Sequence, residues 1–503
     1  MPRPQRTLLC SLLTLALATA QPARALEQLP DLGDPAASSL SVVQERSLGE
    51  RSMAQLRAAG GVLDDPEVNA YLQQLGMRLV ASDPATAGQS FEFFAVPDDA
   101  INAFAMPGGH IGIHLGLLMA TDNESELAAV MAHEISHVTQ RHVARQLEAA
   151  SGSQMASLAA LLAGIVAAAS GQTQVASAAI AGATAGHLQS QLNYSRDHER
   201  EADRIGFSLL VRAGFDPAAM ASFFRRMQQL TAAQDSAAPE YLRSHPLTTE
   251  RIADAEDRAL SARYRQVPDS TDYRFVRALV RSYHGEPEQA VAQLTQRLAR
   301  ADDADRTALR YGLAAAQLRA RDFEGALGTL AALDASGAAH PMIEALAGQV
   351  LMQAGRLDAA IDRYQRALAR FPEHRQLIED YPRALLRANR YQEATAFLSR
   401  RIEAGREDAP LHLLAAEANA GLGQRLSSHY HQGEAYAAMG NLPAAIEQLQ
   451  IALRSKGGDD ITRQIAESRL RTLRDDLRQQ RKAPGEATRA GLGYGSLPAF
   501  THP

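Results

Sequence analysis

The regular hydrophobic pattern of the chain begins at residue 41. From there to residue 80 the apolar residues recur at helical spacing. Two short apolar runs follow, at residues 91–96 and 111–115, and runs of this length are typical of strands. The Pro-Gly-Gly sequence at residues 107–109 predicts a turn before the second run. We therefore expect helices and a small sheet in the N-terminal half.

Helical spacing returns at Thr121, which lies three residues before Glu124 in the spacing of a capping box. The apolar residues that follow share one broad face of a helix, and this helix includes residues 133–137. A second helix is predicted from near Arg196 to near Gly214.

From about Tyr273 the pattern becomes repetitive. A turn-forming or polar residue is followed five positions later by alanine, in the pairs Gly285 with Ala290, Arg321 with Ala326, Gly355 with Ala360, Asn389 with Ala394 and Gly440 with Ala445. Successive pairs start 36, 34, 34 and 51 residues apart. A period of 34 residues is typical of tetratricopeptide (TPR) helix pairs, whose small residues let two helices approach closely. We therefore predict an all-α TPR solenoid over residues 270–482.

The two ends of the chain differ from the rest in composition. Two arginines, an apolar segment and a small-residue cleavage pattern predict that residues 1–25 are a secretory signal peptide. The alternative is an uncleaved signal that anchors the chain in a membrane. Residues 26–40 are expected to be a linker, and residues 483–503, which are rich in Gly, Pro and Ala, a disordered tail.

Residues 149–195 contain no Asp, Glu, Lys or Arg. The simpler interpretation of this segment is a buried helical hairpin. The functional interpretation is a mobile lid, or a surface that makes peripheral contact with a membrane or partner through residues 150–190. The longest apolar run, at residues 156–169, is too short and too rich in alanine to predict a membrane span.

Length and charge narrow the classes of function. With 503 residues the chain is too long for one ordinary core, so several domains are expected. A net charge of −6 is mild for this length and gives no reason to expect a nucleic-acid partner. The one cysteine lies in the predicted signal peptide, so the mature chain would fold without disulfides even in an oxidising compartment.

Residues 133–137 read His-Glu-Ile-Ser-His, an HExxH sequence on a predicted helix. Positions i and i+4 of a helix share a face, so His133 and His137 can bind one Zn²⁺ together. Glu134 lies beside them and can accept a proton from a water that the metal has made acidic. Two surface histidines on an ordinary helix are the alternative, so a third ligand decides between these interpretations.

Catalytic zinc has three protein ligands and one open position. Glu199 and Asp203 lie four residues apart on the second predicted helix, so Glu199 can reach the metal while Asp203 hydrogen-bonds a ligand histidine. Glu201 points elsewhere on that helix and is the weaker candidate. We therefore predict a secreted zinc metalloendopeptidase that binds one Zn²⁺ per chain through His133, His137 and Glu199.

An HExxH sequence followed about 60 residues later by Glu-x-x-Ala-Asp resembles the gluzincin metallopeptidases related to HtpX and the CAAX prenyl proteases. The resemblance is carried by residues 132–142, by residues 201–206 and by the Asn-Ala-Phe-Ala sequence at 102–105. It implies an α+β zincin-type metallopeptidase domain, which we place at residues 41–265. The chain departs from HtpX-type enzymes because it lacks convincing transmembrane helices.

The same resemblance implies how substrate is held. In that family the strand after the Pro-Gly-Gly turn is a sheet edge that pairs with extended substrate. It implies substrate-binding roles for Asn102, Gly109, Ile111 and Ile113 in this chain.

His245-Pro246, with Arg251 six residues after His245, is a further element of the resemblance and implies a place near the metal. A loop histidine could fill the open position on zinc and act as an inhibitory fourth ligand. Alternatively, His245 and Arg251 could stabilise the oxyanion that forms during peptide hydrolysis. A histidine held in a loop by Pro246, without a role at the metal, is the third interpretation.

The combination of a signal peptide, a peptidase and TPR repeats is similar to periplasmic members of this family. The resemblance implies outer-membrane protein quality control, in which misassembled β-barrel proteins are degraded and assembly is assisted. The implied partners are unfolded or stalled outer-membrane proteins and, through the repeats, the β-barrel assembly machinery. The alternative is a non-proteolytic TPR chaperone or scaffold with a largely silent metal site; Glu134 argues against it, because a structural site needs no base.

Overall fold

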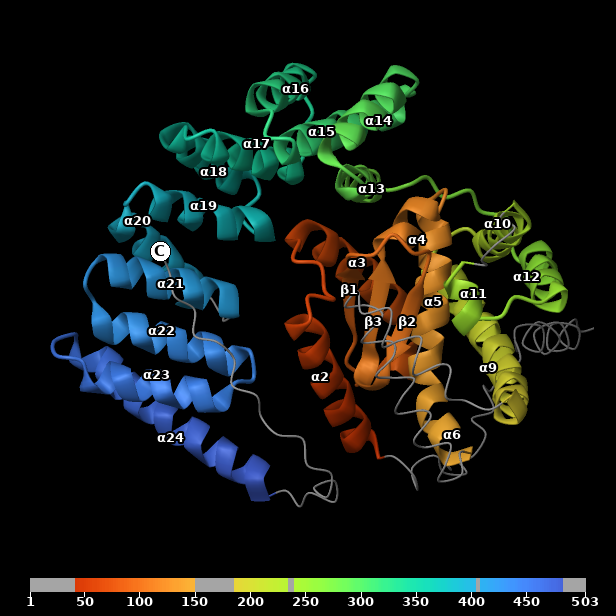
Figure 1. Cartoon of the computed structure of the whole chain (residues 1–503), viewed down its shortest axis with the longest axis horizontal. Coiled ribbons are helices and arrows are strands. Elements are labelled where there is room, and N and C mark those ends of the chain that lie inside the picture. The colour runs from red at the N-terminus through yellow and green to blue at the C-terminus, as the bar shows by residue number, and fades with distance from the viewer. Residues whose placement is uncertain (1–40, 150–184, 234–238, 404–407, 483–503) are drawn as a thin grey trace, which may run out of the picture.

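The structure is a computed structural model that describes residues 41–149, 185–233, 239–403 and 408–482. The predicted signal peptide, linker and C-terminal tail lie outside the described residues, and so does most of the uncharged segment. Figure 1 shows the described chain as two parts, an α+β part in red to yellow and an arc of helices in green to blue that curves over it. No helix in the described part of the chain is long and apolar enough to cross a membrane.

The N-terminal part contains a three-stranded sheet with helices around it. Strands β1 (Glu92–Val96) and β3 (His110–His114) run parallel, and β2 (Ala103–Met106) pairs with β3 in the antiparallel direction. The order is β1-β3-β2, so β3 is the central strand. The prediction that the strand after the Pro-Gly-Gly turn is a sheet edge is therefore wrong, because β3 is hydrogen-bonded on both sides and β2 is the edge next to it.

Helices surround this sheet and lead from it towards the repeats. They are α2 (Val42–Ala58), α3 (Pro66–Val80), α4 (Leu115–Ala120), α5 (Glu124–Thr139), α6 (His142–Ala149), α9 (Ala185–Arg212), α10 (Ala219–Ala233), α11 (Tyr241–Ser244) and α12 (Thr249–Ser261), with short 3₁₀ turns at Pro84–Thr86 and Pro107–Gly109. The two predicted helices are present as α5 and α9. The latter begins earlier than expected, since helical propensity alone does not fix a boundary.

A cap at Thr121 would start helix α5 at residue 122, but α5 begins two residues later, at Glu124. Its N-cap is Asn123, whose side chain accepts a hydrogen bond from the backbone N–H of Glu126. Thr121 instead ends α4, and its hydroxyl lies 3.0 Å from the hydroxyl of Tyr273 in the first repeat helix. The predicted capping box is therefore wrong, because the Thr121 hydroxyl contacts Tyr273, which is distant along the sequence, and does not cap α5.

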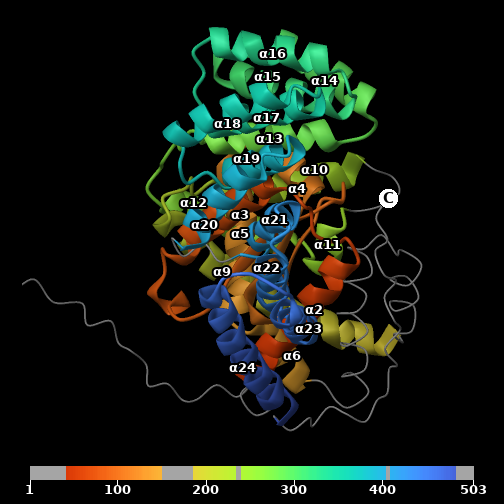
Figure 2. The same ribbon diagram turned by 90° about the vertical axis from the view of Figure 1, so that its left-hand side faces the viewer.

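Twelve helices follow in the described chain, and they confirm the TPR solenoid. They are α13 (Thr271–Tyr283), α14 (Pro287–Ala299), α15 (Asp303–Arg319), α16 (Phe323–Ala335), α17 (Pro341–Gln353), α18 (Leu357–Arg370), α19 (Arg375–Arg387), α20 (Tyr391–Glu403), α21 (Ala409–Gly421), α22 (Arg425–Ala438), α23 (Leu442–Arg454) and α24 (Asp460–Lys482). Turned by 90°, the later repeats lie in front of α3 and α5 (Figure 2).

The recurring turn residues share one backbone conformation. Arg321 and Asn389 have φ values of 58° and 57°, and the three glycines of the pattern are also left-handed. This is the usual conformation just after a helix ends, so each marks the end of one helix. Gly423, 34 residues after Asn389, has the same conformation and is followed five positions later by the buried Ser428. The 51-residue step from Asn389 to Gly440 therefore contains one further turn of the repeat pattern, at Gly423, with serine in place of alanine.

The first repeats and the N-terminal part share one core. A single cluster of buried apolar side chains includes Leu72 on α3, Met131 on α5, Tyr273 on α13 and Leu346 on α17. Later repeats have separate clusters, such as the one around Leu449 and Leu473. The division into domains at residues 265 and 270 remains a prediction, and an extended segment joins α12 to α13 there.

Candidate metal centre

The metal centre lies where α5 and α9 cross. Gly206 on α9 permits the close approach, because a Cβ atom there would lie 3.0 Å from the backbone nitrogen of His133. Helix α5 carries the HExxH residues and α9 carries Glu199 and Asp203, so each helix presents its chemistry to the other. His245 follows directly after α11 and completes the group. His133, Glu199 and Asp203 are all almost fully buried.

Four potential ligand atoms converge. The Nε2 atom of His133 lies 3.0 Å from Nε2 of His137 and 3.3 Å from Oε2 of Glu199. The Nε2 atom of His137 lies 3.4 Å from Oε1 of Glu199. The Nδ1 atom of His245 lies 3.3 Å from Nε2 of His133 and 3.1 Å from each oxygen of Glu199. The structure thus brings together His133, His137 and Glu199, with His245 beside them.

This donor set fits zinc. Imidazole nitrogens and a carboxylate oxygen are its usual ligands. A regular tetrahedron with edges of about 3.3 Å has its centre about 2.0 Å from each corner, which is the length of a Zn–N or Zn–O bond. The separations of 3.0 to 3.4 Å between neighbouring donor atoms are close to this edge length, so the four side chains converge on a space that suits one zinc ion.

Glu134 is fully buried, and its two carboxylate oxygens have no hydrogen-bond partner among the described residues. The Nε2 atom of His245 lies 3.4 Å from Oε1 of Glu134. Burial raises the pKa of Glu134. A buried carboxylate without a hydrogen-bond partner costs stability, and such groups are typical of sites with a chemical role.

Asp203 and Arg251 hold two of the convergent residues. Asp203 Oδ1 lies 3.0 Å from Nδ1 of His133. Arg251 donates to Asp203 from Nε and Nη2, at 2.6 and 2.8 Å, and its Nη1 lies 3.0 Å from Glu199. Arg251 is 4% exposed and also donates to the carbonyl oxygen of Pro246. Its guanidinium is therefore occupied by the carboxylates around the site.

The pKa values of the histidines and of Glu199 in this site depend on the surrounding carboxylates and imidazoles. Burial by itself would lower the pKa of His133, but hydrogen bonds to Asp203 and Glu199 raise it to about 10. Burial dominates at His137 and lowers its pKa to about 4. Burial alone would raise the pKa of Glu199, but His245 and the hydrogen-bonded His133 hold it well below its usual value. A metal bound here requires neutral imidazoles, so its binding would release a proton.

The loop that carries His245 is tied to the sheet. The His245 ring stacks on Tyr241 with centroids 4.7 Å apart. The backbone N–H of Tyr241 donates to the carbonyl oxygen of Ile101, two residues before β2. The position of His245 therefore depends on a contact at the start of the edge strand.

The residues with predicted substrate-binding roles lie near the sheet but not at the metal. Ile111 and Ile113 are fully buried core residues of the central strand. Gly109 forms the turn with φ of 88°, and a Cβ atom there would collide with the carbonyl oxygen of Ser90. Asn102 precedes β2, and its side-chain oxygen is buried without a hydrogen-bond partner among the described residues. The structure thus makes β2, not β3, an edge strand of the sheet.

Sequence reasoning missed His142 and His198. The Nδ1 atom of His142 lies 2.9 Å from Nδ1 of His137, and the His142 ring stacks on that of His198 with centroids 4.1 Å apart. A residue five positions after His137 would point away from it on a continuous helix. The chain instead turns at Arg141, with φ of 51°, and no sequence pattern signals that turn.

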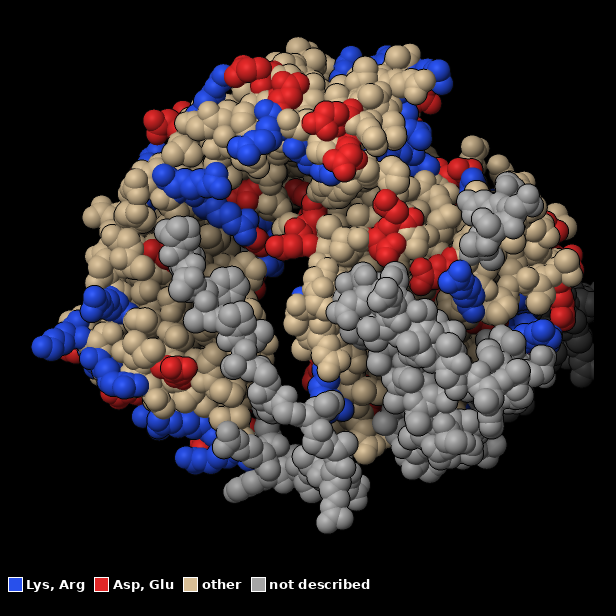
Figure 3. Space-filling model, in the orientation of Figure 1, with Lys and Arg blue, Asp and Glu red and all other residues tan. Residues whose placement is uncertain are grey.

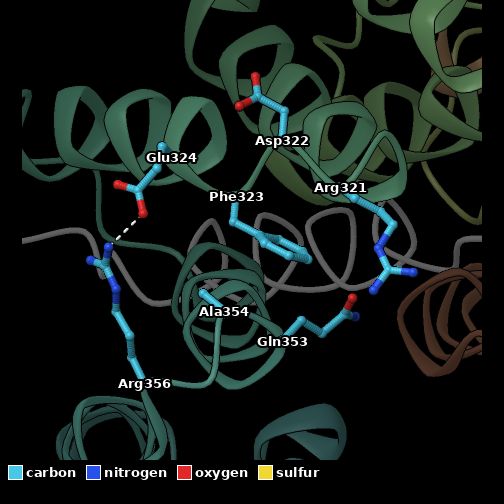
Figure 4. A pocket seen from close by; sticks show the side chains of 7 residues that line it. All are labelled: Arg321, Asp322, Phe323, Glu324, Gln353, Ala354 and Arg356. Atoms are coloured by element: carbon cyan, nitrogen blue, oxygen red, sulfur yellow. Dashed lines mark hydrogen bonds and ion pairs between the residues drawn. The ribbon is translucent and has the colours of Figure 1, made fainter.

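A separate pocket of about 340 Å³ lies among the repeats (Figure 4). Phe323 lies in its middle, and Arg321 and Gln353 point toward one another at one side. Arg356 pairs with Glu324 at the other side. The group of potential metal ligands found in the described chain lies elsewhere, so the chemistry is concentrated at the α5–α9 crossing.

Comparison with known proteins gives two matching families. Residues 66–259 match peptidase family M48, and residues 351–418 match the tetratricopeptide repeat. The matched peptidase segment contains the convergent histidines and Glu199. Membership of this peptidase family implies a metal ion, typically zinc.

Individual relatives extend this similarity over most of the chain. The chain is 35% identical over 429 residues to the beta-barrel assembly-enhancing protease of Escherichia coli (strain K12), which covers 85% of this chain and 87% of the relative. The protein of the same name from Yersinia pestis is 33% identical, over 85% of this chain and 88% of the relative. Metalloprotease LoiP of Escherichia coli (strain K12) is 29% identical, over 44% of this chain and 83% of the relative.

Proposed function

This chain belongs to the β-barrel assembly-enhancing proteases of peptidase family M48, and we propose that it is a zinc-dependent endopeptidase of the periplasm that degrades misassembled outer-membrane β-barrel proteins and assists the assembly of others. Family membership makes the chain a metalloendopeptidase. The observation that carries the catalytic part of the proposal is the buried Glu134 carboxylate, which has no hydrogen-bond partner among the described residues and lies beside the convergent ligand atoms.

We assign His133, His137 and Glu199 as the zinc ligands. A zinc ion held there supplies Lewis-acid chemistry, because it polarises a peptide carbonyl and makes water acidic near neutral pH. Glu134 accepts the proton of the attacking water on its free carboxylate and returns it to the leaving amine. Asp203 and Arg251 act as positioning residues, since Asp203 fixes the His133 ring and Arg251 holds both Asp203 and Glu199.

Substrate pairs with the outer edge of β2 in this proposal. Extended peptides bind at sheet edges because the backbone groups of an edge strand are free to form a further ladder. Strand β2 packs against α5, so a peptide added there would run past the HExxH residues. Asn102, with its unpaired buried side-chain oxygen, lies at the start of that edge and can accept a substrate N–H.

His245 is proposed to be an inhibitory fourth ligand. Its Nδ1 atom lies within 3.3 Å of His133 and Glu199 ligand atoms, which is where the open position of a three-ligand zinc would be. Four protein ligands close a zinc site to substrate. The alternative role, in which His245 stabilises the oxyanion, requires the loop to move His245 away from the metal position. Arg251 is a weaker candidate for that role, because its guanidinium is already bound by Asp203, Glu199 and the carbonyl oxygen of Pro246.

The repeats are proposed to bind clients and the β-barrel assembly machinery. Stacked helix pairs form extended concave surfaces that suit protein partners. Figure 3 shows a hollow between the later repeats and the N-terminal part, and Arg and Lys side chains gather on the later repeats. A peripheral membrane contact through residues 150–190 remains a proposal that the described residues do not address.

One experiment separates the peptidase from the scaffold alternative. Purified wild type and Glu134→Gln would be compared for zinc content, for cleavage of an unfolded protein such as casein, and for outer-membrane assembly in cells. We expect Glu134→Gln to keep zinc and lose cleavage. Wild-type protein that carries zinc but shows no Glu134-dependent cleavage of any unfolded or outer-membrane substrate would favour the chaperone or scaffold function.

A further inference from the structure

We propose that His142 is a positioning residue for the metal ligand His137, and that it links this ligand through Glu201 to Arg145 near the protein surface. The inference rests on the proposed zinc site at His133, His137 and Glu199. It concerns the strength and geometry of metal binding, which can be measured without any protease assay.

The hydrogen-bond directions follow from the ligand role of His137. Its Nε2 atom faces the other ligand atoms, so the lone pair of Nε2 is the one available to a metal. A neutral imidazole then carries its hydrogen on Nδ1. That Nδ1 lies 2.9 Å from Nδ1 of His142, which must accept the hydrogen bond. The hydrogen of the His142 ring is consequently on Nε2, which lies 3.2 Å from Oε2 of Glu201 and donates to it.

An ion pair with Arg145 holds Glu201, and ring stacking with His198 holds His142. Arg145 Nη1 donates to the same oxygen of Glu201 at 2.8 Å. The side chain of Glu201 is 28% exposed, whereas that of His142 is 2% exposed. The ring of His198 lies parallel to His142, with an angle of 5° between the planes. His142 is therefore fixed in position, orientation and tautomer by neighbours on two elements.

A backbone feature brings His142 to the ligand. On a continuous α-helix a residue five positions on points about 140° away, so His142 would miss His137. Arg141 takes up a left-handed conformation between α5 and α6, which is unfavourable for a residue with a side chain. Its Nε atom donates to Glu45 on α2 at 3.1 Å. The turn returns His142 to His137, and a contact with a separate helix stabilises it.

The two ligand histidines of α5 thus have different outer partners. His133 meets the carboxylate of Asp203 directly, and Arg251 buries that pair. His137 contacts the neutral imidazole of His142, and the carboxylate of Glu201 contacts the far side of that imidazole. Outer partners of metal ligands fix ring orientation and raise ligand basicity, and their loss typically weakens metal binding by about tenfold to a hundredfold.

The test measures zinc affinity of the full chain by competition with a chelator of known affinity. His142→Ala is expected to weaken zinc binding by about tenfold to a hundredfold. His142→Asn should recover most of this loss, because its side-chain oxygen can replace the Nδ1 acceptor. Glu201→Ala, at a position whose side chain is 28% exposed, should give a smaller loss, below about tenfold. Visible absorption of the cobalt(II)-substituted protein should change shape in His142→Ala.

The matched control is His412→Ala. His412 is a buried histidine on α21 that contacts the ring of His431, 3.0 Å away between their Nδ1 atoms. It is far from α5 along the solenoid, so its removal should leave zinc affinity and the cobalt spectrum unchanged. Should His142→Ala not fold, His142→Asn and Glu201→Ala still carry the test.

Two results would overturn the proposal. One is wild-type zinc affinity in His142→Ala or, if that variant does not fold, in Glu201→Ala. The other is an equal loss in His142→Asn and His142→Ala, since the acceptor would then be irrelevant. These results differ from those expected if the proposed zinc site itself is wrong. In that case wild-type protein would bind no zinc, or Glu199→Ala would still bind it.

Discussion

Helix α5 buries three glutamates, Glu124, Glu126 and Glu134, and the first and the last of them have opposite surroundings. Glu124, at the first turn, is 6% exposed and accepts hydrogen bonds from Tyr71 and from both the hydroxyl and the backbone N–H of Ser270. Its own backbone N–H donates to Asp269. Glu134, ten residues on, is fully buried, and its carboxylate has no such donor among the described residues.

The difference separates a structural carboxylate from a chemical one. A buried acceptor with several donors helps to specify one packing, and here it ties the start of α13 to α5. A buried acceptor without donors costs stability and is free to take a proton. The same residue type therefore has two roles on one helix: Glu124 at the first turn holds the two parts of the molecule together, and Glu134 in the C-terminal half faces the metal ligands.

The largest effect is expected from the ligands next to Glu134. His133→Ala, His137→Ala and Glu199→Ala should each lose stoichiometric zinc, because each variant removes one of the assigned ligands from the closed four-ligand site. Metal analysis of purified protein after dialysis measures this. Asp197→Ala, at an exposed position on the same helix as Glu199, is the control and should retain about one zinc per chain. Zinc retained in Glu199→Ala but lost in Glu201→Ala would reverse the assignment.

The next effect is on catalysis alone. Glu134→Gln should lower kcat by about 10²- to 10⁴-fold while zinc content is unchanged, because the general base is lost and the ligands are not. The raised pKa of Glu134 means that its charged form destabilises the fold; this penalty is absent below the unfolded-state pKa, grows as pH rises and is complete above the folded-state pKa. The zinc-free variant should therefore melt at least as high as zinc-free wild type at neutral pH. Near-normal kcat would show that another group is the base.

The third prediction concerns the neighbour of Glu134. His245→Ala should raise basal proteolysis and self-cleavage if His245 closes the metal, because the fourth position then becomes available. Hydrolysis of a fluorogenic peptide, followed with zinc content, measures the change. A fall in kcat by about tenfold to a thousandfold with zinc retained would instead support an oxyanion role. His340→Ala, in the repeats, provides a matched histidine control.

The smallest effect is expected at the other end of α5. Glu124→Gln should destabilise the fold by about 1 to 3 kcal/mol, because the amide cannot accept all three hydrogen bonds. Denaturant unfolding of the zinc-loaded chain measures this, and kcat per folded molecule should be unchanged. A large drop in kcat with unaltered stability in Glu124→Gln would show that Glu124 has a chemical role and not a structural one.

Much of the site could be predicted because local spacing fixes it. The i, i+4 relation puts His133 and His137 on one face, and the same relation puts Glu199 and Asp203 together on α9. The 34-residue period likewise predicts the repeats, since each depends on contacts with its neighbours. The roles of these side chains remain predictions for the experiments above.

The sequence by itself determined which residue types stand at which spacing, and hence the metal chemistry, the helices that carry it and the repeat architecture. The tertiary structure decided what depends on the path of the backbone between distant segments. It made β3 central and β2 the edge, it returned His142 to His137 through the turn at Arg141, and it gave Glu124 donors that Glu134 lacks. Local periodicity says which face a side chain lies on, but only packing decides what meets that face.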